Sequence, residues 1–195
     1  MKQKKSSSKL KTSSKPSAKL SKITSLLAEN KTILLIMPSS SYHQEILKIV
    51  KNLSPKSVCY VTLSKTSDAL KELFKKNKLN LNNIVFIDTI SKTIRSTPSQ
   101  SNNCYYVSSP GALTELSIVI DKFLRHNFDY LIFDSITNLM IYQSKNTVEQ
   151  FLQNLINKVK GSNTKAVFYA LKIPDQESLI KESSQFVDKA INVGK

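Results

Sequence analysis

Short, continuous apolar runs recur along this chain of 195 residues, and a stretch with helical spacing follows most of them. Such runs are typical of strands that are buried on both faces, as in a parallel sheet. The runs are TILLIM (32–37), SVCYVTL (57–63), NIVFID (83–88), YLIF (130–133) and KAVFYAL (165–171). Strands that alternate with helices predict an α/β fold, in which helices cover both faces of a parallel sheet.

The segments between these runs place apolar residues three and four positions apart, so each predicts a helix that buries one stripe. The predicted helices span 45–53, 67–76 with Thr66 or Ser67 as the cap, 113–126, 147–160, and a last one from a cap at Asp175 to between Lys181 and Ser184. Four further segments predict a short helical lead-in (23–30), a mobile surface loop (89–103), a short strand or loop return (104–107) and an edge strand (186–193).

Positive charge is concentrated at the start of the chain. The net charge is +15, and residues 1–22 hold eight lysines and no acidic residue. This Lys- and Ser-rich arm has too few apolar residues to bury, so we expect it to be disordered and residues 23–195 to form the folded domain. Its lysines suit nucleic acid or an anionic membrane surface, although a solvated tail without a partner would have the same composition.

Two features limit the class of protein. No apolar run reaches the roughly 18 residues that a membrane-spanning helix needs, so we expect no transmembrane segment. Cys59 and Cys104 lie in apolar contexts without the spacing of a metal site or a disulfide framework. We read both as small buried residues in a reducing compartment and predict a cytoplasmic protein.

Carboxylates follow two of the predicted strands. Asp134, with Ser135 after it, ends the central apolar run, and Asp88 ends an earlier one. Ligands of open parallel sheets bind at the carboxyl ends of the strands, where a carboxylate commonly holds Mg²⁺ in nucleotide-binding proteins. Asp134 is therefore the candidate metal ligand. The alternative role for both acids is structural, as hydrogen-bond acceptors that cap the loops.

The order of these pieces resembles that of the RecA-like ATPases of the KaiC kind, especially the archaeal KaiC-like group, over about residues 24–193. Residues 130–171 are similar to the family's Walker B strand with its Asp-Ser end, the long helix after it and the next strand. Residues 58–70 are similar to the strand and helix that follow the family's phosphate loop, and residues 83–91 are similar to the strand after them. The resemblance implies a three-layer RecA-like domain that packs against a second copy or a paralogue, with ATP at the interface.

The phosphate loop departs from the family's pattern, G-x-x-x-x-G-K-[ST]. The matching eight positions are MPSSSYHQ (37–44), so that Met37 and Tyr42 replace the glycines, and His43 and Gln44 replace the Lys and the Ser/Thr. Without glycines the loop does not readily let a phosphate approach its backbone. A neutral histidine is also a poor substitute for a fixed positive charge.

A second departure concerns the general base. Ser64 and Lys65 stand where the family has acidic residues that activate the attacking water, and neither can act as a carboxylate does. We therefore predict a catalytically inactive RecA-like domain, a pseudo-ATPase that needs no cofactor. It would act as a regulatory or interaction module, through a protein partner or as a homo-oligomer.

Two other functions remain open. A nucleotide sensor or weak ATPase would hold ATP and Mg²⁺ through Ser39, Ser40 and Ser41 at the start of a helix, which attracts anions, together with His43 and Gln44. A nucleic-acid-binding accessory protein would bind through residues 1–22 and use the folded domain to form oligomers.

Overall fold

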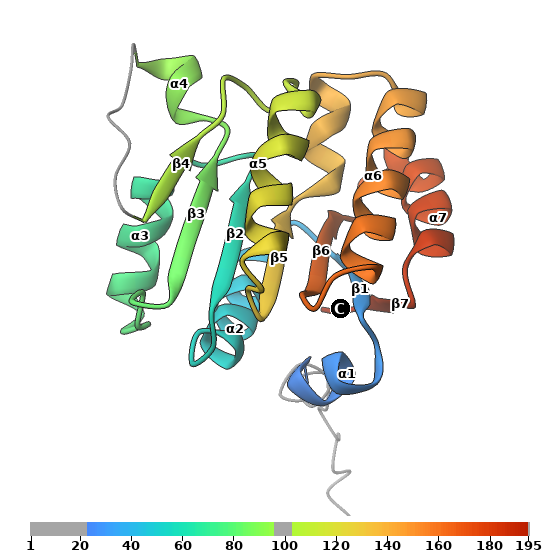
Figure 1. Cartoon of the computed structure of the whole chain (residues 1–195). Helices are drawn as coiled ribbons and strands as arrows, with labels where there is room; N and C mark the ends of the chain where they lie inside the picture. Colours follow the sequence, from blue (N-terminus) through green and yellow to red (C-terminus); the bar gives the residue numbers. More distant parts are fainter. Residues whose placement is uncertain (1–22, 96–102, 195) are drawn as a thin grey trace, which may run out of the picture.

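One parallel sheet forms the centre of the molecule in the computed structural model, which describes residues 23–95 and 103–194. The predicted arm 1–22 lies outside these ranges, as does the middle of the predicted loop 89–103. The strands of the sheet follow the order β4–β3–β2–β5–β6–β1–β7 (Figure 1). They are β1 (Thr32–Met37), β2 (Val58–Thr62), β3 (Ile84–Asp88), β4 (Cys104–Tyr106), β5 (Tyr130–Asp134), β6 (Lys165–Leu171) and β7 (Lys189–Asn192).

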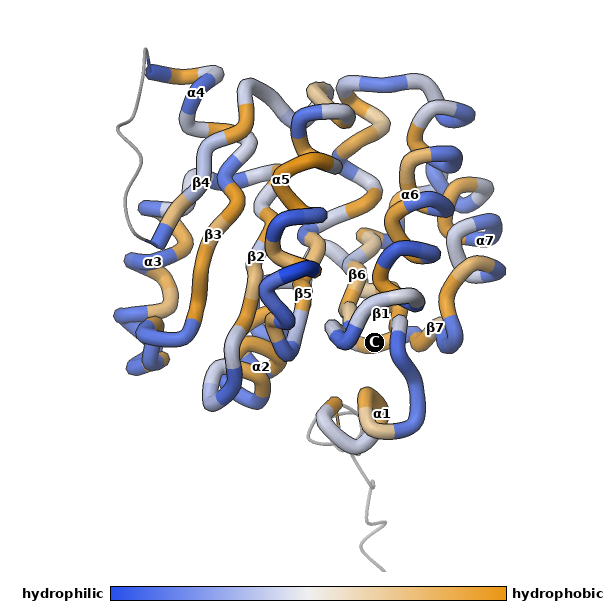
Figure 2. The backbone as a smooth tube through the Cα atoms, in the orientation of Figure 1, coloured by the Kyte–Doolittle hydropathy of each residue, from blue (hydrophilic) through white to orange (hydrophobic). Residues whose placement is uncertain are grey.

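Helices cover both faces of this sheet, as the alternating pattern predicts (Figure 1). One layer contains α1 (Ile23–Glu29), α2 (Tyr42–Leu53) and α3 (Ser67–Lys76), and the other contains α5 (Leu113–Arg125), α6 (Lys145–Lys160) and α7 (Glu177–Phe186). Figure 2 shows hydrophobic residues along the strands and hydrophilic residues recurring on the helices. None of the helices in the described ranges is long and apolar enough to cross a membrane.

The pleat of each strand divides its side chains between two cores. In β5, Leu131 and Phe133 pack with α5, α6 and α7, whereas Ile132 packs with the layer of α1, α2 and α3. Side chains two residues apart in a strand share a face. Asp134 therefore faces the layer that contains α2, and this orientation decides its partners.

The structure corrects three of the local predictions. Residues 91–94 form the short helix α4 (Ser91–Ile94) inside the segment predicted to be a loop. Helix α6 begins at Lys145 rather than Thr147, because Ser144 is its N-cap and its hydroxyl accepts a bond from the Thr147 N–H. Asp175 caps no helix: it lies in the 3₁₀ turn η2 (Pro174–Gln176), and α7 follows without a side-chain cap.

The carboxyl ends of β1, β2, β3 and β5 meet at one edge of the sheet because every strand pair is parallel. At this edge Thr62 of β2 is in register with Asp88 on one side and with Asp134 on the other. The two acids are thus two strands apart, about 10 Å between backbones. This distance separates them into two sites.

Candidate functional site

Asp134 is fully buried, and both of its carboxylate oxygens accept hydrogen bonds from tyrosines. The Tyr42 hydroxyl, in the first turn of α2, donates to Oδ1. The Tyr60 hydroxyl, from the middle of β2, donates to Oδ2. Tyr169 of β6 is a third buried tyrosine on this face of the sheet. We call these four residues the tyrosine–aspartate cluster.

Electrostatics keep the tyrosines of this cluster in their donor form. Burial raises the pKa of Asp134 to about 6, although the hydrogen bonds from Tyr42 and Tyr60 act in the opposite direction. Burial, and next the charge of Asp134, raise the pKa of Tyr42, Tyr60 and Tyr169 far above the physiological range. The Tyr169 hydroxyl is buried and has no hydrogen-bond partner within the described residues.

A short turn after β1 places Tyr42 in this cluster. Only residues 38–41 connect β1 to α2. The Ser41 N–H donates to the Pro38 carbonyl at 3.1 Å, and the Tyr42 N–H donates to the Ser39 carbonyl at 3.4 Å. The chain therefore turns tightly, and the first helical side chain points into the molecule rather than towards solvent.

The other predicted phosphate-loop residues do not reach Asp134. Ser39, Ser40, His43 and Gln44 are exposed at the start of α2. Ser41 is half-buried, and its hydroxyl donates to the Pro38 carbonyl at 3.3 Å instead of capping the helix. The loop is therefore a surface turn, and the candidate metal ligand lies in the core behind Tyr42.

The last described residues cover one side of this turn. The Val193 N–H donates to the Ile36 carbonyl at 2.9 Å. Gly194 follows with a φ of 76°, and a Cβ atom there would collide with the Ser41 hydroxyl. Glycine meets both requirements, the left-handed backbone and the close approach.

Asp88 has a capping role at the same edge. Its buried carboxylate accepts hydrogen bonds from the N–H groups of Ser67 (2.6 Å), Ile90 (2.8 Å) and Ser91 (2.8 Å), and from the Ser91 hydroxyl (2.7 Å). Burial raises the pKa of Asp88, but these hydrogen bonds outweigh it and leave the pKa below its ordinary value. Asp88 thus anchors the first turns of α3 and α4. Among the described residues, no three His, Cys, Asp or Glu side chains are grouped as a metal site requires.

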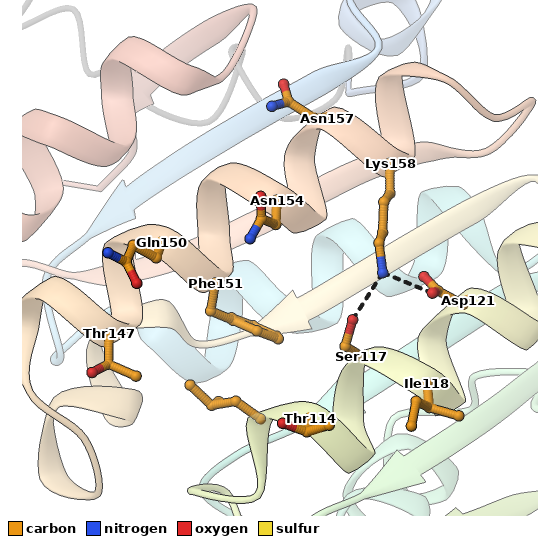
Figure 3. A pocket seen from close by; sticks show the side chains of 11 residues that line it. Thr114, Ser117, Ile118, Asp121, Thr147, Gln150, Phe151, Asn154, Asn157 and Lys158 are labelled. Carbon is orange, nitrogen blue, oxygen red and sulfur yellow. Dashed lines mark hydrogen bonds and ion pairs between the residues drawn. The ribbon is translucent and has the colours of Figure 1, made fainter.

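A groove of about 690 Å³ lies elsewhere, on the outer face of α5 and α6 (Figure 3). Lys158 bridges its walls, with its ammonium group 3.0 Å from the Ser117 hydroxyl and 2.7 Å from Asp121 Oδ2. Ile118 is 56% exposed at its rim. The lining contains no residue from the carboxyl ends of the strands. This groove is therefore separate from the edge of the sheet that carries Asp134, which we call the Asp134 edge.

Sequence reasoning missed Tyr60 and Tyr169, which complete the cluster. The available signal was a tyrosine within an apolar strand, because a buried tyrosine hydroxyl usually needs a hydrogen-bond partner. The sequence gives no comparable signal for Gly194, which lies against Ser41 although the two residues are far apart in the chain.

No family model matches the sequence, and no curated protein matches it. Among solved structures, the chain is similar to a KaiC-like protein from the hyperthermophilic archaeon Pyrococcus horikoshii OT3, with a TM-score of 0.58 and 12% sequence identity. The match covers 83% of this chain and 70% of that chain. At this identity the likeness shows the fold alone: the predicted RecA-like α/β fold is confirmed.

Proposed function

We propose that this protein is a RecA-like domain without ATP hydrolysis, which acts as a regulatory or interaction module. The observation that carries the proposal is the enclosure of Asp134, since both carboxylate oxygens accept hydrogen bonds from tyrosine hydroxyls in a fully buried position. Tyr42, which stands at the second glycine position of the phosphate-loop pattern, supplies one of these bonds. The Tyr42 side chain therefore occupies the position from which a metal-bound nucleotide would have to approach Asp134.

The surroundings of Asp134 do not fit a Mg²⁺ ion either. This ion prefers octahedral oxygen ligands and retains several of its waters, which requires an open, hydrated carboxylate. Asp134 is fully buried behind Tyr42 and Tyr60, so the ion and its waters would have to displace these tyrosines and leave buried hydroxyls without their acceptor. The exposed His43 offers no fixed charge for a phosphate. These features support a domain that keeps the fold and uses it as a scaffold.

A titration with ATP and Mg²⁺ tests this proposal through the melting temperature. A ligand at 100 times its Kd would stabilise the folded protein by about 2.7 kcal/mol, so binding would be easy to detect. We expect no shift at millimolar ATP, and no turnover above background. The control is Tyr42→Phe, which removes one hydroxyl from Asp134 and keeps the ring. A clear shift with the natural protein would favour the nucleotide sensor, and turnover that Asp134→Asn abolishes would refute the proposal.

An interaction module also needs a surface for its partner, and we assign this role to the groove between α5 and α6. The exposed Ile118 and the partly buried Leu113 both line the wall that α5 forms, and amide side chains of α6 form the opposite wall. We propose that a second copy of the chain packs here. The same proposal places the protein in the cytoplasm, in keeping with the free, buried Cys59 and Cys104.

Ile118→Glu is expected to lower self-association at least tenfold, because a charge would replace an exposed apolar side chain that the second copy would bury. Sedimentation over a concentration series measures the effect. Ile94→Glu is the matched control, since Ile94 is 66% exposed on α4 and lies outside the groove. Equal behaviour of the two variants in an oligomeric protein would contradict the assignment.

A further inference from the structure

Positive charge gathers at the end of the folded domain that lies opposite the Asp134 edge. The helices run back against the parallel strands, so their carboxyl ends lie where the strands begin (Figure 1). Helix α1 lies at this same end (Figure 1). Six segments form it, each running from the last four residues of a helix to the first residue of the next strand. They are 26–32, 50–58, 73–84, 122–130, 157–165 and 183–189.

The charge balance of these segments is strongly one-sided. Their basic residues are Lys31, Lys51, Lys56, Lys75, Lys76, Lys78, Lys122, Arg125, Lys158, Lys160, Lys165 and Lys189, and their acidic residues are Glu29, Asp129 and Asp188. Twelve positive and three negative charges give +9. The rest of residues 23–194 holds 8 basic and 11 acidic residues, or −3. We call the +9 surface the basic end.

Local structural roles account for only part of this charge. Lys158 and Lys160 form ion pairs with Asp121 and Asp188 at 2.7 and 2.9 Å, and Lys31 and Lys165 donate to backbone carbonyls. Cations near helix carboxyl ends also offset the helix dipole. However, eight basic residues are exposed and form no ion pair within the described residues. They are Lys51, Lys56, Lys75, Lys76, Lys78, Lys122, Arg125 and Lys189.

Five of these eight residues lie at the carboxyl ends of α2 and α3 or just after them, and both helices belong to the same layer. Residues 1–22, with eight more lysines, directly precede α1 in the sequence. Unpaired cations that are spread over neighbouring helix ends suit a partner with regularly spaced negative charges.

The chemistry of the basic end favours nucleic acid over a lipid surface. Proteins that lie on membranes usually insert apolar side chains next to their lysines. The large hydrophobic residues exposed in the described ranges all lie outside the six segments: Ile94, Tyr105, Ile118, Ile141 and Tyr142. Binding to a phosphate backbone requires only the charges. We propose that the basic end binds the sugar–phosphate backbone of nucleic acid without sequence selectivity.

The test compares two charge-matched variants of the full chain. Lys51, Lys75 and Lys76 are replaced by glutamine in one, and Lys92, Lys172 and Lys181, which lie outside the basic end, are replaced in the other. The probes are a labelled short DNA duplex and an RNA duplex of equal length. Fluorescence anisotropy measures the affinity between about 50 and about 200 mM salt.

We expect the first variant to bind at least tenfold more weakly at about 100 mM salt, because it loses up to three phosphate contacts. Each lost contact also reduces the steepness of log K against log salt by about 0.9. The slope should therefore decrease by up to about 3, while the control variant stays within about twofold of the natural protein. Three results would overturn the proposal: equal loss in both variants, no loss in the first variant, or no binding of either duplex at low salt.

Vesicles rich in phosphatidylserine form the second arm of the experiment. Nucleic acid binding that exceeds vesicle binding supports the proposal. Tighter binding to vesicles, lost in the Lys51, Lys75 and Lys76 variant, would overturn it in favour of a membrane surface.

Discussion

Replacement of Asp88 by alanine is expected to lower the free energy of unfolding by about 3–5 kcal/mol. The carboxylate is buried and accepts four hydrogen bonds, three of them from the N–H groups of Ser67, Ile90 and Ser91. Alanine would leave these groups without acceptors, at a cost of about 1–3 kcal/mol for each one that water cannot reach. Urea unfolding at neutral pH measures the loss.

Asp129→Ala is the matched control for this measurement. Asp129 likewise accepts bonds from a backbone N–H and a hydroxyl, those of Ser57 (3.0 and 2.6 Å), but it is exposed. Water can replace the lost acceptor there, so we expect a loss of about 1 kcal/mol or less. If Asp88→Ala were as mild as Asp129→Ala, the capping role of Asp88 would be wrong.

Asp88 and Asp134 illustrate what a sequence can and cannot predict. Each ends an apolar run, and the predicted parallel sheet correctly places both at one edge. Their surroundings nevertheless differ, because backbone N–H groups surround Asp88 whereas tyrosines enclose Asp134. The partners of Asp134 lie 92 and 74 residues away in the chain, at Tyr42 and Tyr60. Local patterns do not encode such contacts.

The strands were predictable because burial on both faces leaves a continuous apolar run, and β1 and β6 match their runs residue for residue. The errors fall where a single hydrogen bond decides the structure. Helix α6 starts at Lys145 because of the Ser144 cap, and α4 forms where the carboxylate of Asp88 holds the N–H groups of Ile90 and Ser91. Apolar periodicity does not report such bonds, since a four-residue helix has almost no buried stripe.

The stabilising contribution of Asp134 is expected to decrease as the pH rises, opposite to the usual behaviour of a carboxylate. Burial raises its pKa from 3.8 to about 6, so between these pH values the folded protein binds more protons than the unfolded chain. The contribution is complete below about pH 4 and is lost as the pH rises through about 6. Two pH units at about 1.4 kcal/mol each make the whole effect about 3 kcal/mol.

Urea unfolding of the natural protein and Asp134→Asn at several pH values isolates this effect. Between about pH 4.5 and about pH 7 the stability of the natural protein relative to the variant should fall by about 2 kcal/mol. The same comparison with Asp88→Asn should be flat in this range, because the pKa of Asp88 is below its ordinary value and its contribution is lost only in stronger acid.

Tyr42→Phe gives an independent check on the cluster. The hydrogen bond from Tyr42 lowers the pKa of Asp134, so its removal should move the decrease in stability to higher pH. A flat response of the Asp134→Asn comparison would mean that the carboxylate is open to water. The enclosure of Asp134 by Tyr42 and Tyr60 would then no longer support the loss of ATP hydrolysis, since an open carboxylate at this edge is free to accept a metal ion.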